Sequence, residues 1–152
     1  MTTFFIFAAK YLIVLPVLIL GGYFLMKPWQ EQKHMMLFAI PAALLAYVLA
    51  LIAGHIYFDP RPFVVGHFTP LVPHAADNGF PSDHTLLASA LAAIGMYWNK
   101  RLGLGLWIIA AVIAVARVYV GVHHTIDVVA SMLIALAATV AWHAAYRHSL
   151  HR

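Results

Sequence analysis

The sequence contains no cysteine and very little charge. Of its 152 residues, 9% are Asp, Glu, Lys or Arg, whereas 64% are hydrophobic. The absence of cysteine excludes disulfides, thiolate metal sites and cysteine nucleophiles. Soluble domains carry about a quarter charged residues, so the low charge content excludes an ordinary soluble protein. The long uncharged runs indicate a helical integral membrane protein instead.

Most of the chain belongs to five apolar runs, which cover about residues 4–26, 35–58, 83–98, 102–121 and 125–146. A membrane helix needs about 20 residues, and the runs are close to that length. The segment 59–82 separates the second run from the third and holds four of the eight prolines in its first fifteen residues, which favours an ordered loop. We predict one all-α domain over residues 1–152, a polytopic membrane bundle of about five transmembrane helices with one long outer loop.

The positive charges predict the orientation of this bundle. Two connectors and the tail, which must share one side of the bilayer, carry Lys27, Lys33, Lys100, Arg101, Arg147 and Arg152. The positive-inside rule makes this side cytoplasmic, so we expect the amino terminus outside and the carboxyl terminus inside. The net charge of +4 comes from connectors and not from a basic stripe, so no nucleic-acid partner is predicted. The sequence does not determine an oligomeric state.

A first polar cluster lies between the last two runs. His123 and Asp127 are four residues apart, so on a helical turn the carboxylate can reach the ring and fix its tautomer. Arg117 offers a planar guanidinium suited to phosphate oxygens. Taken alone, the cluster also fits a buried salt bridge beside a helix start.

Two further clusters fall on the same outer side. Pro81 and Ser82 can begin a helix whose free N–H groups bind an anion, with His84 beside them. Pro60 and Pro62 fix the backbone around Arg61. Alone, these fit an ordinary helix cap and a stiff loop. Together, the three clusters supply phosphate donors, a nucleophile and an acid, the requirements of phosphoryl transfer.

The order Arg-Pro, Pro-Ser-x-His, Arg-x5-His-x3-Asp resembles the three signature motifs of the type-2 phosphatidic acid phosphatase and haloperoxidase superfamily, over about residues 54–127. Asp83 in the second motif and Pro60-Arg61-Pro62-Phe63 in the first are similar to the bacitracin-resistance type of undecaprenyl-diphosphatase.

This resemblance implies a role for each motif residue. His123 would be the nucleophile that forms a phosphohistidine, Asp127 would orient it, and His84 would protonate the leaving oxygen and later activate water. The transferred phosphate would be held by Arg61, Arg117, Ser82 and the backbone N–H of Asp83. The resemblance implies no metal and no cofactor.

The sequence departs from the family pattern in one important place. The first motif usually begins with a lysine seven residues before its arginine, and Gly54 occupies that position. Lys10 and His55 are candidates for an auxiliary cation that replaces it. His124 has no assigned role, and His67 and His74 lie in the outer loop without a recognised metal-ligand spacing.

The expected function is hydrolysis of undecaprenyl diphosphate at the outer face of the bacterial inner membrane, which would recycle the lipid carrier of cell-wall synthesis. The expected partners are the polyprenyl diphosphate substrate and membrane lipids. One alternative is a phosphatase for phosphatidylglycerophosphate or phosphatidic acid. Another is a small ion or proton transporter, because intramembrane His, Asp and Arg residues also serve in such pathways. A haem protein is a weaker alternative.

Overall fold

The computed structural model describes the backbone of residues 1–150 and the side chains of residues 1–148. The helices are α1 (Thr2–Tyr11), α2 (Val14–Leu25), α3 (Trp29–Ile56), α4 (Pro62–Val65), α5 (Asp83–Trp98), α6 (Lys100–Tyr119) and α7 (Thr125–Leu150). Within residues 1–150 the only β-type pairing is an isolated bridge between Pro60 and Asn78. The prediction of an all-α membrane bundle is confirmed. Arg152, which entered the orientation argument, lies outside the described residues.

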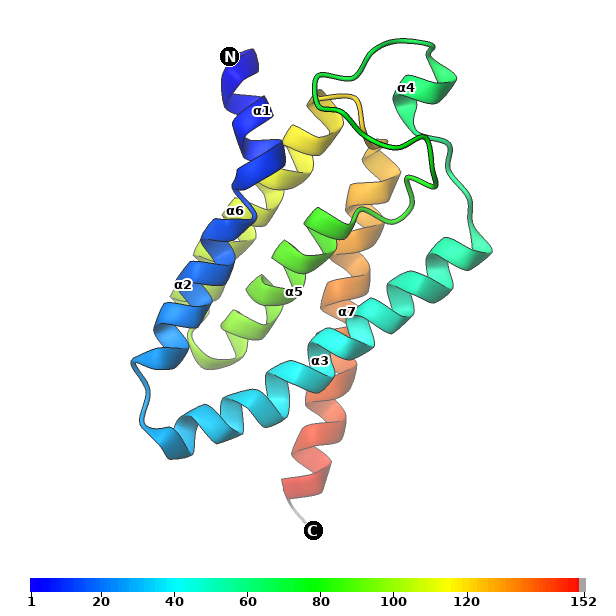
Figure 1. The fold of residues 1–152 in the computed structure, drawn as a ribbon. Coiled ribbons are helices and arrows are strands. Elements are labelled where there is room, and N and C mark those ends of the chain that lie inside the picture. Colours follow the sequence, from blue (N-terminus) through cyan, green and yellow to red (C-terminus); the bar gives the residue numbers. More distant parts are fainter. Residues whose placement is uncertain (151–152) are drawn as a thin grey trace.

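The helices differ in their ability to cross a bilayer. Helices α3, α6 and α7 are each long and apolar enough, and α1 with α2 forms a bent pair that can make a fourth crossing. Helix α5 has 16 residues. At 1.5 Å per residue it covers about 24 Å, less than the hydrocarbon core of roughly 30 Å. It lies between the longer helices and packs against α3, α6 and α7 (Figure 1). By length and composition, three of the five predicted spans and the bent pair can cross a bilayer, whereas α5, which also runs from the loop end to the opposite end, is shorter.

The first predicted span, residues 4–26, is broken in the structure. Helices α1 and α2 meet at an angle of 48°. Pro16 explains the break, because its ring would collide with the carbonyl of Leu12, four residues earlier, and it has no N–H to bond there. That carbonyl accepts a hydrogen bond from Leu15 N at 3.0 Å instead. The bend leaves Ala8 and Ala9 buried in a cluster with residues from the end of α6.

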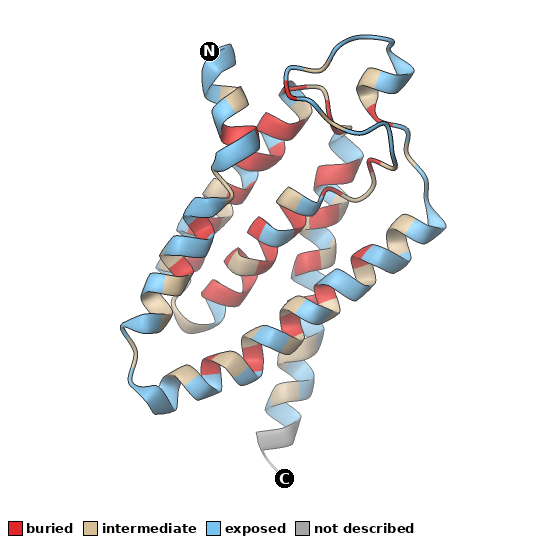
Figure 2. Ribbon diagram, in the orientation of Figure 1, coloured by how far each residue is buried: buried red, intermediate tan, exposed pale blue. Residues whose placement is uncertain are grey.

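Buried residues of α2, α3, α6 and α7 form clusters with buried residues of α5 (Figure 2). Helices α5 and α6 are joined only through Asn99, whose Oδ1 accepts hydrogen bonds from the N–H groups of Arg101 and Leu102 at 3.0 and 3.1 Å. This cap forms the tight turn predicted from residues 99–101. The two helices approach each other closely at Gly103, where an added Cβ would lie 2.5 Å from the Cα of Met96. Only glycine fits between the two helices at this point.

The three polar clusters gather at one end of the bundle. Helix α4, the loop 66–82, the end of α6 and the start of α7 all lie there, as does the amino terminus (Figure 1). The turns between α2 and α3 and between α5 and α6 lie at the other end, with the carboxyl-terminal part of α7. Segments more than fifty residues apart in the chain can therefore contribute to one site.

We predict that Gly103→Ala destabilises the protein while Gly105→Ala does not. The new methyl group at position 103 would overlap Met96, and overpacking of this kind costs about 1–3 kcal/mol. An added Cβ at Gly105 meets nothing within 4 Å, so the higher helix propensity of alanine should stabilise by roughly 0.5–1 kcal/mol. Melting temperatures in one detergent would test this, and equal shifts for the two variants would contradict the packing.

Candidate active site

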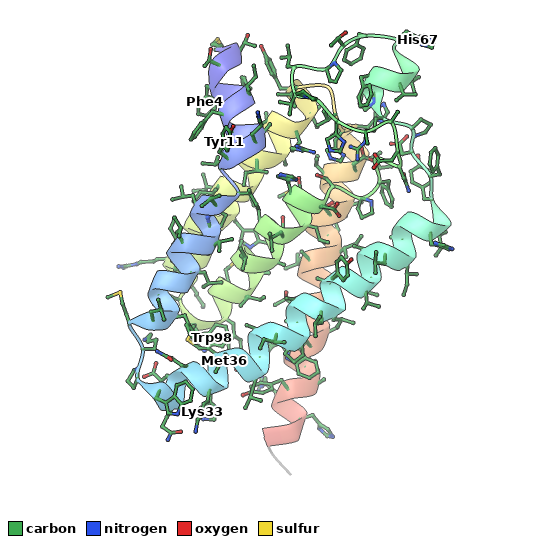
Figure 3. All side chains as sticks on the ribbon, in the orientation of Figure 1. Phe4, Tyr11, Lys33, Met36, His67 and Trp98 are labelled. Atoms are coloured by element: carbon green, nitrogen blue, oxygen red, sulfur yellow. The ribbon has the colours of Figure 1, made fainter. Side chains whose placement is uncertain are left out.

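Four charged or titratable side chains from distant segments are buried at the loop end of the bundle. The exposed fractions are 5% for Arg61, 3% for Arg117, 2% for His123 and 0% for Asp127. Burying such groups is costly unless they bond to one another or to a ligand. Figure 3 shows nitrogen and oxygen atoms gathered where the loop meets α6 and α7. The structure thus brings together the cations, the imidazole and the carboxylate of the first and third motifs.

The hydrogen bonds of His123 determine its tautomer. Its Nδ1 lies 2.9 Å from the carbonyl oxygen of Gly79 and 3.2 Å from Oδ2 of Asp127. Both oxygens are acceptors, so Nδ1 carries the proton and Nε2 keeps a free lone pair in the neutral ring. Nη1 of Arg61 lies 3.4 Å from this Nε2, and Nη2 of Arg117 lies 3.3 Å from it. Two guanidinium groups therefore converge on the nitrogen that is able to attack an electrophile.

The surroundings of His123 also favour its neutral form. Burial lowers the pKa of His123, the hydrogen bond to Asp127 opposes this effect, and the charges of Arg117 and Arg61 add to the lowering. The net result is a pKa below the ordinary histidine value. Because only the neutral ring is nucleophilic, the ring is in its reactive form at neutral pH.

The orientation of Arg61 depends on contacts across the loop as well as on the two flanking prolines. Its Nε donates to Oδ1 of Asp77 at 2.7 Å. Its Nη1 and Nη2 donate to the carbonyls of Val122 at 2.9 Å and Asn78 at 3.3 Å. Donors of one guanidinium are thus shared between the 77–78 segment and the turn before α7, which holds the group in a single position.

Asn78 is a structural centre of the loop that sequence reasoning missed. Its Oδ1 accepts from the N–H groups of Asp59 at 2.9 Å and Phe80 at 3.0 Å. Its Nδ2 donates to the carbonyl of Gly54 at 2.9 Å. The Asn78 side chain therefore connects the end of α3 to the loop backbone at Asp59 and at Phe80. It also fixes the neighbouring Gly79, whose carbonyl accepts a hydrogen bond from the His123 imidazole. The Asn-Gly pair at 78–79 is typical of a turn, but nothing in the sequence indicates that Asn78 would bond to Gly54 and Asp59.

A second layer of polar groups lies behind Asp127. Nδ1 of His124 is 3.0 Å from Oδ2 of Asp59, and the His124 N–H donates to Oδ2 of Asp127 at 2.9 Å. Burial and the nearby Asp127 carboxylate raise the pKa of Asp59. One potential metal-ligand atom from each of Asp59, His124 and Asp127 lies within 4.8 Å of the other two, so the three side chains could hold a cation. In the structure they bond to each other, so His124 has a defined place as a partner of Asp59.

The second motif forms the start of α5, as predicted. Ser82 precedes the helix and is fully buried, and its Oγ accepts from Oγ1 of Thr85 at 3.2 Å. The side chain of Asp83 is exposed. His84 is half-buried and interacts electrostatically with Arg117 and His123, so it lies at the same end as the buried cluster.

The two candidates for an auxiliary cation do not join the buried cluster. Lys10 is exposed, and its Nζ lies 5.3 Å from the ring centroid of Tyr11. His55 is exposed and borders a pocket beside Asp83. Position 54 has no room for a lysine, because an added Cβ would lie 2.9 Å from the carbonyl oxygen of Phe80.

His74 is a second residue that sequence reasoning left without a role. It is half-buried in the outer loop, and its ring centroid lies 6.2 Å from that of His123. Burial and the charges of Arg61 and Arg117 lower the pKa of His74. No spacing signal in the sequence could have placed it, because 49 residues separate the two histidines.

Fold and site together define a multi-pass membrane protein with a buried cluster of arginine, histidine and aspartate side chains at one end. Comparison with known proteins identifies its relatives. The PAP2 superfamily profile matches residues 35–150. Undecaprenyl-diphosphatase BcrC of Bacillus subtilis (strain 168) is 36% identical over 131 residues, which are 86% of this chain and 67% of the relative. The chain belongs to the PAP2 superfamily and is a membrane phosphatase.

Two solved structures resemble the fold. Aquifex aeolicus LpxE superimposes with a TM-score of 0.72 at 24% identity, over 93% of this chain and 82% of the other. The first transmembrane PAP2 type phosphatidylglycerolphosphate phosphatase of Bacillus subtilis gives a TM-score of 0.62 at 25% identity, over 97% and 75%. The likeness extends over nearly the whole bundle.

We predict that Asn78→Ala lowers kcat at least about 10-fold, because loss of several buried hydrogen bonds lets the loop and its His123 contact shift. Asn99→Ala is the matched control, since it removes a helix cap worth about 1 kcal/mol at the far end of the bundle. It should lower the melting temperature and leave kcat unchanged. Equal kcat values for the two variants would show that Asn78 does not hold the site.

Proposed function

We propose that this protein hydrolyses undecaprenyl diphosphate to undecaprenyl phosphate and inorganic phosphate through a phosphohistidine at His123. The observation that carries the proposal is the state of its Nε2. That nitrogen is unprotonated because Nδ1 donates to two oxygens, and it is flanked by two guanidinium groups. A nucleophile between two phosphate-binding cations fits attack on a terminal phosphoryl group.

In the first step, Nε2 of His123 attacks the terminal phosphorus of the diphosphate. The bond from that phosphorus to the bridging oxygen breaks, and His84 gives its proton to the leaving lipid phosphate. Arg61 and Arg117 hold the oxygens of the transferred phosphoryl group, with the Ser82 hydroxyl and the Asp83 N–H as further donors. Asp127 stabilises the positive charge that develops on the imidazole.

In the second step, His84 takes a proton from water, whose oxygen attacks the phosphorus of the phosphohistidine. The phosphorus–nitrogen bond breaks, inorganic phosphate leaves, and the neutral His123 is restored. Both steps need His84 close to the phosphorus. Its electrostatic interaction with Arg117 and His123 supports this arrangement. The residues named here complete the cycle without a metal or another cofactor.

An apolar groove supports a lipid substrate with a long tail. The groove runs between α6 and α7 and is lined by residues such as Val115, Val129 and Met132. It shares Val118 and Tyr119 with the pocket that contains His123. An isoprenoid tail lying in this groove would keep its diphosphate at the end of the bundle. The relative named undecaprenyl-diphosphatase supports the choice of head group and tail.

We place the site at the outer face of a bacterial inner membrane, with the amino terminus outside and the carboxyl terminus in the cytoplasm. The loop end holds the site, while Lys27, Lys33, Lys100 and Arg101 lie at the opposite end, which the positive-inside rule assigns to the cytoplasm. An outer site fits carrier recycling, because the diphosphate is released there when a polymer is assembled.

A phosphatidylglycerophosphate phosphatase is the second candidate, favoured by the solved relative from Bacillus subtilis that bears this name. The transporter alternative has less support. Among the described residues, the buried Arg, His and Asp side chains all lie at the loop end and form no path through the bundle.

The substrate assignment predicts that the purified protein releases phosphate from undecaprenyl diphosphate with a kcat/KM at least about 10-fold above that for phosphatidylglycerophosphate or phosphatidic acid, a difference of about 1.4 kcal/mol. Phosphate release in matched mixed micelles would measure it. A preference for either glycerolipid would transfer the function to the second candidate.

The covalent mechanism predicts that His123→Ala lowers kcat by at least about 1000-fold, because a covalent nucleophile is lost. Acid-stable labelling is not expected, since phosphohistidine is acid-labile, so the labelled intermediate should be trapped by rapid quenching in alkaline detergent. His124→Ala should still form the labelled intermediate, because the Asp127 contact at position 124 is made by the backbone N–H. Labelling of the His123→Ala variant would exclude this residue as the nucleophile.

A further inference from the structure

A third basic side chain, His74, lies near His123 and interacts electrostatically with the two guanidinium groups. Its ring and that of His123 are 6.2 Å apart between centroids and inclined at 74°. The ring is half-buried, although the adjacent Pro73 and Ala75 are exposed. Its buried Nδ1 makes no hydrogen bond of standard geometry to any described residue, although an interaction with the backbone of Ala75 acts to raise the pKa of the ring. Buried polar atoms normally have a partner, so a nitrogen in this position has an unused capacity to bind a ligand.

The charge around this ring is dominated by cations. The charged or titratable groups that interact with it come from the loop, α5, α6 and the turn before α7, and they are Arg61, Asp77, His84, Arg117 and His123. Burial and the guanidinium charges lower the pKa of His74, which favours the neutral ring in the unliganded protein at neutral pH. A diphosphate reverses this balance, because its negative charges offset the guanidinium charges and stabilise a protonated ring.

Of the other positions considered for a third cation, position 54 has no room for a side chain and the other two are exposed. Gly54 lies against the Phe80 carbonyl, with 2.9 Å between that oxygen and an added Cβ, so the end of α3 cannot supply a side chain there. Lys10 and His55 are exposed. His74, from the outer loop, has its ring centroid 6.2 Å from that of His123.

We propose that His74 is a phosphate-binding residue that takes up a proton when a diphosphate enters the site and then donates a hydrogen bond to a phosphate oxygen. The identity of the lipid in this inference rests on the proposed function, whereas the binding of a diphosphate group does not. The residue acts on affinity, because the nucleophile and the leaving-group acid are separate side chains. A charge-assisted bond of this kind accounts for about a 10-fold change in affinity.

The test is calorimetric binding of inorganic pyrophosphate to the full chain in detergent, in two buffers of different ionisation enthalpy. The two buffers give the number of protons taken up on binding. We expect His74→Ala to weaken binding about 10-fold and to reduce proton uptake. His74→Gln keeps a hydrogen-bond donor without a titrating charge, so it should bind with intermediate affinity and show the same reduced uptake. The His74→Gln variant also tests the proposal if the His74→Ala variant does not fold.

His67→Asn is the matched control. His67 is an exposed histidine of the same loop with a φ of 51°, a conformation that asparagine accepts readily. The His67→Asn variant should bind pyrophosphate with the same affinity and take up the same number of protons as the wild type. Equal weakening in this control would assign the effect to the loop and overturn the proposal. Unchanged affinity and proton uptake in His74→Ala, or no binding by the wild type, would also overturn it.

Turnover supplies a second readout. His74→Ala should raise KM for undecaprenyl diphosphate about 10-fold with kcat within about 3-fold of wild type, and the rise of KM with pH should be weaker than in the wild type. A fall in kcat with unchanged KM would assign His74 to the chemical step and contradict a binding role. If the wild type does not cleave this lipid, the proposed function fails while the pyrophosphate measurement still decides the role of His74.

Discussion

The pair of hydrogen bonds donated by Nδ1 of His123 is the interaction on which the site depends. By donating to Gly79 and Asp127, Nδ1 fixes the tautomer and leaves Nε2 unprotonated. The orientation of the ring then directs this nitrogen toward the two guanidinium groups. If the Gly79 carbonyl or the Asp127 carboxylate moved, the His123 ring would rotate, and its Nε2 would no longer lie between the guanidinium groups of Arg61 and Arg117. The proposed nucleophile is thus defined as much by a loop carbonyl as by its carboxylate partner.

The long loop between α3 and α5 is held in place by specific hydrogen bonds. The side-chain amide of Asn78 forms hydrogen bonds with the backbone of Asp59, Phe80 and the end of α3. An isolated β-bridge between Pro60 and Asn78 brings the two sides of the loop together. Loops carry function when a rigid scaffold positions them. Here the scaffold is the bundle of α5, α6 and α7, and the loop closes over its end to deliver Arg61 and His74.

The incomplete pairing of the buried guanidinium groups at this end explains why the site suits an anion. Two guanidinium groups are buried, and Asp77 is the acidic partner of only one of them. Nε of Arg117 is buried without a partner among the described residues. Buried cations that are incompletely paired are stabilised by a bound anion, because the anion replaces the water they have lost. A bound anion would therefore offset the energetic cost of assembling these groups.

The apolar spacing and the local motifs were sufficient to predict the main features of the bundle. The limits of α5 agree with the predicted run 83–98, and the predicted contact between His123 and Asp127 is present at 3.2 Å. Both predictions concern residues close in the chain, although His123 lies in the turn before α7 and not on the helical turn that the prediction assumed. The break between α1 and α2 was missed, although Pro16 was a visible signal, because an apolar run alone does not reveal a bend.

The sequence by itself determined the membrane class, the apolar helices and the motif residues that meet at one end. Only the tertiary structure decided the partners of Asn78, the pairing of His124 with Asp59, the absence of space at Gly54 and the position of His74. The physical reason is separation along the chain. A contact within one helical turn follows from fixed backbone geometry, whereas a contact across tens of residues depends on how loop and helices pack, which no local pattern encodes.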